Sequence, residues 1–266
     1  MLNKLKKAAL VGSGLLVLAG CSSESADDAS VNSEAVGAET LVVGLDDTFA
    51  PMGFRDENNE IVGFDVDLAK AVGERIGAEI VFQPIDWAMK ETELDSGNID
   101  MIWNGYAITP ERAEKVLLSE PYIVDAQSII VLKDSAIETK ADLEGKLVST
   151  QQSSSSVDKI MEDESGIFGK LGGDLVLYPS NNNAFSDLES GRVDAIVVGE
   201  VYGRYYMKQS GKDIYRVLED NFGEDEMAVA FKKNNTELQE RVDVALADMK
   251  EDGTFDEIYD KWFYSE

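Results

Sequence analysis

Four positions in the sequence carry groups that together suit the two ends of a small zwitterion. Arg112 presents a planar guanidinium that matches a carboxylate. The serine run at residues 153–156, at an expected helix start, offers hydroxyls and free backbone N–H groups, which also favour an anion. Asp46 and Glu200 carry carboxylates of the kind that hold an ammonium group. These residue types predict a site for a small polar ligand with a charge at each end.

Each of these residues also has an explanation that needs no ligand. In a chain this acidic, Arg112 is suited to a surface ion pair, and serine runs are usually plain loops. One of the neighbours Asp46 and Asp47 fits a solvated loop acid. The two do not make a convincing glycosidase pair, because nothing in the sequence raises the pKa of one of them specifically.

Three aromatic residues near these positions are suited to packing a ligand side chain. Phe49, Trp87 and Trp103 each present a large ring. Taken one by one, they fit the hydrophobic core as well as a ligand-facing wall. The sequence alone leaves this choice open.

The composition removes several classes of function. The 266 residues include 52 acidic and 24 basic side chains and have a net charge of −28. Nucleic acid is therefore not an expected partner, because phosphate binding needs clustered Lys and Arg. The absence of histidine removes Ser-His-Asp and Cys-His nucleophiles and the commonest zinc ligand sets. No phosphate-binding glycine motif is present, so we expect neither a metal nor a cofactor.

The N-terminal residues have the pattern of an export signal. Lys4, Lys6 and Lys7 precede a mostly apolar run at residues 8–19, which is too short for a mature membrane span. The run ends in Leu18-Ala19-Gly20-Cys21, which resembles the bacterial lipobox, and Cys21 is the only cysteine. The alternative is an ordinary signal peptide with a chance cysteine. We expect cleavage after residue 20, a lipid on Cys21, and anchoring at the outer face of a bacterial cell membrane.

A polar segment then leads into a repeated pattern. Residues 21–39 are rich in Ser, Ala, Asp and Glu and are predicted to form a flexible tether. Residues 94–102 match residues 188–196, and each copy has the pattern of short β-branched runs that alternate with helices. The repeat predicts two α/β lobes, each with a largely parallel sheet.

Two apolar strands bracket the second copy and predict how the lobes connect. These are residues 128–132 before it and 227–231 after it. If both cross between the lobes, lobe one contains residues 40–127 plus 226–266, and lobe two contains residues 128–225. Two lobes joined by two crossover strands can hinge about a cleft. Within lobe one, residues 65–76 predict a helix with Asp65 as its N-cap and Gly77 just beyond its end.

The strand pattern also predicts which residues face the cleft. In open α/β sheets, ligands bind beyond the carboxyl ends of the strands. The residues that follow the predicted strands are 46–49, 103–112, 151–156 and 199–200. We therefore place the candidate side chains in one cleft.

Several segments, in order, resemble the family 3 extracellular solute-binding proteins. This family includes the histidine-, glutamine- and arginine-binding proteins of amino-acid ABC importers. The matching segments are residues 44–52, 63–69, 100–112, 121–122, 191–195, 252–255 and 261–263. The resemblance implies a type II periplasmic-binding-protein fold that closes on its ligand.

The resemblance also implies roles for individual residues. The family arginine at the Arg112 position holds the ligand carboxylate, and the acid at the Asp46 position often holds the amino group. Rings or apolar groups at the Phe49 and Trp87 positions sandwich the ligand side chain. Further contacts come from groups near Asn104, Gly105, Ala107, Ser154 and Ser155.

Two positions depart from the family pattern. Many members carry an aspartate that binds the ligand ammonium where this chain has Gly199, and Glu200 follows it. Either Glu200 takes that role, or Asp46 does more, or the ligand lacks the usual amino contact. Ser153 stands where the family often has glycine.

The expected function is binding without catalysis. The resemblance implies a monomeric substrate-binding component that passes an amino acid or similar small carboxylate to ABC permease and ATPase subunits. The first alternative is a secreted enzyme on the same fold, similar to cyclohexadienyl dehydratase, acting on a small carboxylic acid. A sensor domain is the weaker alternative, because no membrane helix or signalling domain follows.

Overall fold

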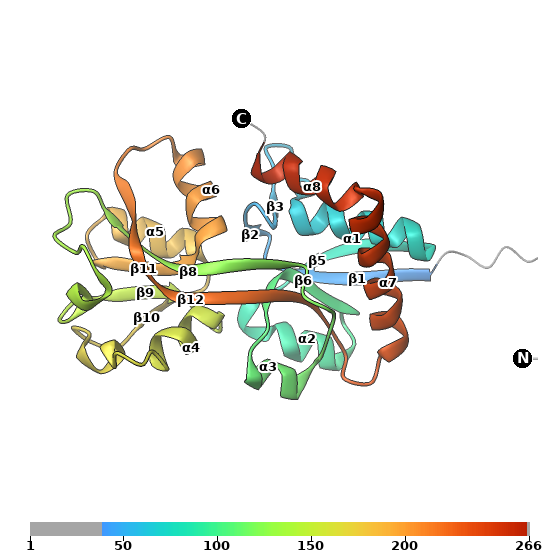
Figure 1. Cartoon of the computed structure of the whole chain (residues 1–266), viewed down its shortest axis with the longest axis horizontal. Coiled ribbons are helices and arrows are strands. Elements are labelled where there is room, and N and C mark those ends of the chain that lie inside the picture. The colour runs from blue at the N-terminus through green and yellow to red at the C-terminus, as the bar shows by residue number, and fades with distance from the viewer. Residues whose placement is uncertain (1–38, 265–266) are drawn as a thin grey trace, which may run out of the picture. The chain divides into compact units, whose positions relative to one another are not determined.

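Figure 1 shows the computed structural model of the chain, which describes residues 39–264. The predicted signal peptide, Cys21 and the predicted tether up to residue 38 lie outside the described residues. Glu39 begins the first strand, β1 (Glu39–Leu45). Among residues 39–264, no helix is both long and apolar enough to cross a bilayer.

The first half of the chain forms a parallel three-stranded core. Strand β1 lies between β5 (Ala78–Pro84) and β6 (Met101–Ala107) and pairs with both in parallel. Helices α1 (Phe64–Ile76) and α2 (Lys90–Ser96) make the two connections. We call this half, with the C-terminal helices that pack on it, lobe one.

The second copy repeats this order. Strand β9 (Val148–Gln151) lies between β10 (Val176–Tyr178) and β11 (Ala195–Gly199), again in parallel. Helices α4 (Ser155–Met161) and α5 (Asn181–Glu189) make the connections. This half, with the helix α6 (Glu200–Ser210) that follows it, is lobe two. The sequence repeat therefore corresponds to the same strand order in both lobes.

Two long antiparallel strands run between the lobes (Figure 1). Strand β8 (Ile123–Leu132) pairs with β11, strand β12 (Tyr215–Phe231) pairs with β6, and β8 pairs with β12. The result is one mixed sheet in the order β10-β9-β11-β8-β12-β6-β1-β5, with β7 (Leu117–Leu118) on β12. Both crossover strands are longer than the sequence predicted. Because they pass through both lobes, the lobe boundaries at 127/128 and 225/226 stay a prediction.

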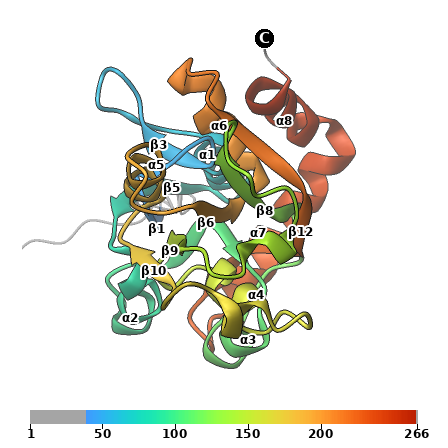
Figure 2. The ribbon, with the colours of Figure 1, turned by 90° about the vertical axis from the view of Figure 1, so that its left-hand side faces the viewer.

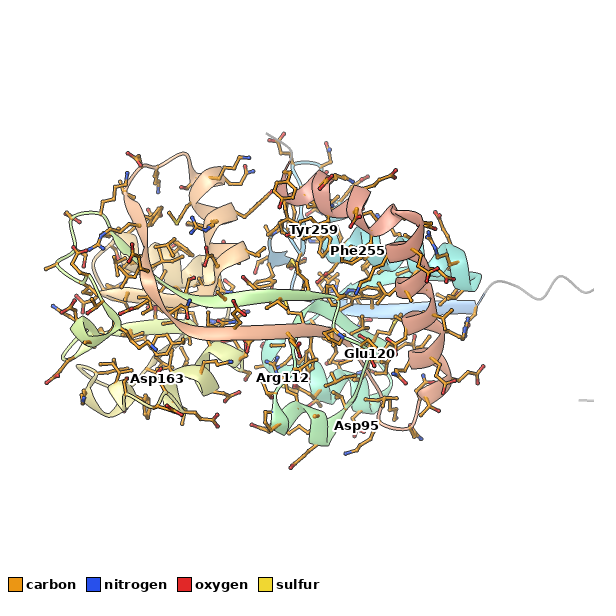
Figure 3. The ribbon with its side chains drawn as sticks, viewed as in Figure 1. Asp95, Arg112, Glu120, Asp163, Phe255 and Tyr259 are labelled. Carbon is orange, nitrogen blue, oxygen red and sulfur yellow. The ribbon has the colours of Figure 1, made fainter. Side chains whose placement is uncertain are left out.

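Helices cover both faces of the sheet in each lobe. Figure 2 shows lobe two with α5 and α6 on one side of its strands and α4 on the other. In lobe one, α1 packs against α7 (Thr236–Asp252) and α8 (Thr254–Phe263). Figure 3 shows Phe255 and Tyr259 on α8, and both rings meet Phe64 of α1 edge-on, at centroid distances of 5.8 and 5.9 Å. This aromatic contact joins the C-terminal helices to lobe one.

The remaining elements are short. A separate antiparallel sheet follows β1 and consists of β2 (Thr48–Phe49), β3 (Gly53–Arg55) and β4 (Ile61–Val62). Helix α3 (Pro110–Lys115) follows β6. Short 3-10 turns cover Trp87–Met89, Lys140–Leu143 and Ile167–Lys170.

The helix ends confirm one sequence prediction and correct another. Gly77 ends α1 in the left-handed conformation, with φ 71°, as predicted. Asp65 is not the N-cap: Gly63 occupies that position, and Asp65 lies one residue inside the helix. The Asp65 carboxylate instead turns into the protein and accepts a hydrogen bond of 2.7 Å from the backbone N–H of Gly105. Asp65 therefore binds a backbone group that is distant in sequence, and not a backbone N–H of its own helix.

Candidate functional site

A cavity with polar and apolar walls lies between the two lobes. Its wall contains eight of the ten ligand-binding residues predicted from the sequence. They are Asp46, Phe49, Trp87, Asn104, Gly105, Arg112, Ser154 and Ser155. The first six come from lobe one and the two serines from lobe two, so the candidate residues do converge across the cleft.

The other two predicted residues lie elsewhere. Ala107 does not line the cavity, but its carbonyl oxygen accepts a hydrogen bond of 3.0 Å from Nη1 of Arg112. Glu200 does not line it either, because residue 200 begins α6 and its side chain turns back. Its carboxylate accepts from Ser128 Oγ at 2.9 Å and pairs with Arg204 at 2.5 Å. Trp103 is fully buried in the core of lobe one.

Arg112 is held rigidly at the lobe-one side of the cavity. The Thr109 hydroxyl accepts a hydrogen bond from the Arg112 backbone N–H, and Pro110 begins the helix, so the start of α3 is fixed. The guanidinium lies over the ring of Tyr106, 4.5 Å from its centroid. Figure 3 shows Arg112 where the α2–α3 side of lobe one approaches α4 of lobe two.

Among the described residues, the Arg112 guanidinium donates hydrogen bonds only to backbone carbonyl oxygens. The side chain is 6 % exposed. Nη1 donates to Ala107 O and Nη2 donates to Ser153 O, each at 3.0 Å. A buried charge that no carboxylate contacts directly is costly. A ligand carboxylate in the cavity would therefore be strongly stabilised beside this guanidinium.

Asp46, another residue of the cavity wall, links the two lobes. Its Oδ1 accepts from the backbone N–H and the hydroxyl of Thr48 at 2.9 and 2.6 Å. Its Oδ2 accepts from Nε2 of Gln151, in lobe two, at 2.7 Å. Burial raises the pKa of Asp46, which these hydrogen bonds partly oppose. Its backbone N–H donates to Oδ1 of Asn104 at 3.1 Å, so two predicted site residues also hold each other.

Aromatic rings form the apolar part of the cleft. Phe49 of lobe one stacks on Tyr202 of lobe two, with centroids 5.1 Å apart and planes 7° apart. Trp87 is buried and meets Tyr106 edge-on at 6.2 Å. The sequence left open whether Phe49 and Trp87 belong to the hydrophobic core or face the ligand. Both line the cavity.

Gly105 has a backbone conformation that keeps the wall open. Its φ is 57°, in the left-handed region that favours glycine, and a Cβ there would lie 3.0 Å from Cε1 of Phe49. Its N–H is held by the buried carboxylate of Asp65. Burial raises the pKa of Asp65 to about 7.

Seven further residues line the cavity: Gln127, Gln151, Ser156, Asn181, Val198, Gly199 and Met227. Gln151, Ser156 and Gly199 belong to the strand-end segments that the sequence placed at the cleft, whereas the other four were missed. Asn181 follows β10, so the strand-end rule that found Asp46 points to it as well. Gln127 and Met227 lie within crossover strands, where that rule gives no signal.

A buried acid organises the serines on the lobe-two side. Asp225 of β12 accepts from Ser155 Oγ at 2.6 Å and from Gln127 Nε2 at 2.9 Å through one carboxylate oxygen. Ser156 Oγ donates to Oε1 of Gln127 at 2.6 Å. Lys159 balances the charge of Asp225 at 3.1 Å. These contacts fix the orientation of the polar groups that face the cavity.

Lys90 is a second buried cation of lobe one that contacts lobe two, and the sequence did not predict it. It is 2 % exposed, and its Nζ donates to Trp87 O at 3.2 Å and to Ser153 O at 3.1 Å. Burial, followed by the nearby charge of Arg112, lowers its pKa to about 8. Ser153 has a φ of 55°, which is uncommon for a residue with a side chain. The carbonyl oxygen of Ser153 thus accepts hydrogen bonds from two buried cations of lobe one, Arg112 and Lys90.

The fold and the site together define a two-lobed binding protein for a small anionic or zwitterionic solute. The sequence model of bacterial extracellular solute-binding proteins, family 3, matches residues 41–265. The chain belongs to this family. Membership confirms the fold class and the general function that the sequence motifs predicted.

Individual relatives differ in the solute that they bind. The L-cystine-binding protein TcyJ of Escherichia coli strain K12 is 30 % identical over 265 residues, which cover 98 % of this chain and 97 % of the relative. A substrate-binding protein of an ABC uptake transporter from Streptococcus pneumoniae, crystallised with histidine, has a TM-score of 0.82 and 36 % identity. The match covers 85 % of this chain and 93 % of that one.

A third similar structure is that of a binding protein described as the precursor of an enzyme. It is the ancestral amino-acid-binding protein AncCDT-1, a precursor of cyclohexadienyl dehydratase. It has a TM-score of 0.76 and 34 % identity, over 84 % of this chain and 95 % of that one.

Proposed function

We propose that this protein captures a polar amino acid in the interlobe cleft and delivers it to the permease and ATPase subunits of an ABC importer. The observation that carries the proposal is the buried guanidinium of Arg112, which faces the cavity and whose hydrogen-bond acceptors among the described residues are both backbone carbonyl oxygens. One relative binds cystine and another was crystallised with histidine, and these two ligands share the amino-acid backbone but differ in side chain. The ligand carboxylate would lie at Arg112, and its side chain between Phe49 and Trp87.

The experiment is calorimetry of the purified protein against a panel of free amino acids and matching small carboxylates. We expect saturable binding of at least one polar amino acid at one site per chain. Native mass spectrometry of protein purified from its own host would identify a retained ligand directly. Binding of non-amino carboxylates alone, across the whole panel, would contradict the amino-acid assignment.

We also propose that this activity is located at the cell surface. The lipobox at residues 18–21 supports a lipid anchor on Cys21 at the outer face of the cell membrane, with residues up to 38 as a tether. An anchored binding protein stays close to its permease, so its effective concentration there is high. The same interpretation treats the mature protein as a monomer.

One specific observation keeps an enzymatic role as the second candidate. AncCDT-1, which is similar to this chain, is a precursor of a dehydratase. Asp46 lies in the cleft with its pKa raised by burial, a property that general acids also have. We favour binding without catalysis, because both oxygens of Asp46 already accept hydrogen bonds from protein groups. Turnover assays with small aromatic carboxylic acids, read by product formation, distinguish the two roles.

A further inference from the structure

Gly199, at the wall of the cleft cavity, lies directly against the carboxylate of another residue. Gly199 ends β11 and lines the cavity. A Cβ at this position would lie 2.4 Å from Oδ2 and 3.5 Å from Cγ of Asp125. Real Cβ atoms do not approach another heavy atom at 2.4 Å. The carboxylate of Asp125 therefore occupies the place where a side chain at residue 199 would begin.

Asp125 reaches this place from a crossover strand. It lies on β8 two residues before Gln127, so both side chains point to the same side of that strand. Gln127 lines the cleft cavity, and β8 pairs Gln127 with Gly199. Asp125 also lines a narrow cavity whose wall contains Phe49 and Met227, and both of these residues line the main cavity.

The two oxygens of Asp125 have different surroundings. Oδ1 accepts a hydrogen bond of 3.1 Å from the backbone N–H of Val201, in the first turn of α6. Oδ2 is the oxygen that lies against Gly199. The first contact fixes the carboxylate, and the second directs its other oxygen toward the glycine in the cavity wall.

The charge around Asp125 favours the arrival of a cation. The residue is 5 % exposed, and burial raises its pKa to about 7. The acids Glu200 and Asp225 raise the pKa further. An ammonium group at Gly199 would stabilise the ionised carboxylate and offset the repulsion from its acidic neighbours.

We propose that Asp125 binds the ammonium group of the ligand, and that glycine at position 199 leaves the space through which its carboxylate is reached. This inference rests on the proposed amino-acid binding. Asp46 is the acid among the residues that line the main cavity, but its two oxygens already accept three hydrogen bonds, from Thr48 and Gln151. Arg112 and Asp125 then provide opposite charges for the two ends of one amino acid.

The test compares Asp125→Asn with the wild type by calorimetry, using the best amino acid of the panel and its deaminated analogue. We expect amino-acid binding to weaken at least about tenfold, in the range for loss of one partner of a buried charged pair. Binding of the analogue should change less than about twofold, because it has no ammonium to lose. Asp213→Asn is the matched control and should bind both ligands as the wild type does, because Asp213 is an exposed acid of lobe two that pairs with Lys133.

Two further measurements show whether the loss of affinity in Asp125→Asn comes from the missing charge or from a disturbed fold. Gly199→Asp combined with Asp125→Gly returns a carboxylate to the same wall, and should recover most of the lost amino-acid affinity. At pH 7 the wild type should also release protons on binding, measured as a dependence of binding enthalpy on buffer. Asp125→Asn should lose that release.

The outcomes separate the two proposals. If the wild type binds no amino acid, both the proposed function and this inference are overturned. If the wild type binds an amino acid and Asp125→Asn binds it within about twofold of that affinity, only the assignment of Asp125 is overturned. Equal proton release by wild type and Asp125→Asn leads to the same conclusion.

Discussion

Nη2 of Arg112 in lobe one donates a hydrogen bond of 3.0 Å to the carbonyl oxygen of Ser153 in lobe two. The same guanidinium lines the cavity and is the proposed partner of the ligand carboxylate. One side chain therefore contacts the other lobe and faces the ligand site. Lys90 donates to the same carbonyl oxygen at 3.1 Å, so two cations of lobe one meet one backbone group of lobe two. Ligand binding and contact between the lobes thus depend on shared atoms.

Arg112→Ala should abolish most of the affinity for the ligand. Truncating one partner of a buried charged pair costs roughly 2–5 kcal/mol. This corresponds to a loss on the order of 30-fold to several-thousand-fold in affinity. Calorimetry with the best ligand measures it. Arg192→Ala is the control, because Arg192 is exposed and pairs with Asp187 on the surface of lobe two. A loss of less than about threefold in Arg112→Ala would show that the carboxylate binds elsewhere.

Lys90→Met should weaken ligand binding without removing a predicted ligand contact. The change keeps an apolar stem in the buried space and deletes the hydrogen bond to Ser153 O. A hydrogen bond to a charged group contributes about 1.5–3 kcal/mol, so we expect a loss of about tenfold or more. Calorimetry gives the affinity, and small-angle scattering reports whether the lobes separate. Lys115→Met, which removes an exposed lysine of α3, should bind as the wild type does. Unchanged affinity in Lys90→Met would mean that this contact does not stabilise the bound form.

Asp65→Asn should become more stable relative to the wild type as the pH rises from about 4 to 8. Burial raises the pKa of Asp65 from 3.8 to about 7, so the folded state binds a proton that the unfolded state has released. The stability of the wild type therefore falls with rising pH across this window, and the fall is complete above pH 7. The difference reaches on the order of a few kcal/mol. Denaturant unfolding at several pH values measures it.

Asp56→Asn is the control for that series and should differ from the wild type by a nearly constant amount between pH 4 and 8. The pKa of Asp56, an exposed residue, is lowered, with the largest contribution from the hydrogen bond of the Glu60 backbone N–H. Its ionised form stabilises the fold above pH 4, and this contribution is lost as the pH falls. Asp56→Asn should thus be less stable than the wild type by about the same amount from pH 4 to 8, and the difference should shrink only below about pH 4. If Asp65→Asn and the wild type keep a constant difference from pH 4 to 8, the pKa assignment for Asp65 is wrong.

Cys21→Ser should prevent lipid attachment and release the protein from the cell surface. The thiol of the lipobox cysteine is the acceptor of the lipid, and a hydroxyl cannot replace it in this reaction. Metabolic labelling with a lipid precursor, together with fractionation of cells and medium, measures both effects. Ser23→Ala, two residues further along, should be labelled like the wild type. Equal labelling of wild type and Cys21→Ser would end the lipoprotein proposal.

The sequence by itself determined the features that depend on short-range pattern. The repeat at residues 94–102 and 188–196 predicted the two parallel cores, because β-branched runs and helix periodicity are local properties. The rule that ligands bind beyond strand ends placed Asp46 and Arg112 at one cleft, and both line the cavity. Gly77 was recognisable as a helix end because the left-handed conformation there favours glycine.

Only the tertiary structure decided which side chains complete the site. Glu200 follows a strand in sequence, but it begins a helix, so its carboxylate turns to Ser128 and Arg204. Asp65 had the signature of an N-cap, yet a partner forty positions away, Gly105, takes its carboxylate. Asp125 lies against Gly199 because two distant strands pair in one register. Such contacts depend on long-range pairing and on burial, which residue types and spacing along the chain do not encode directly.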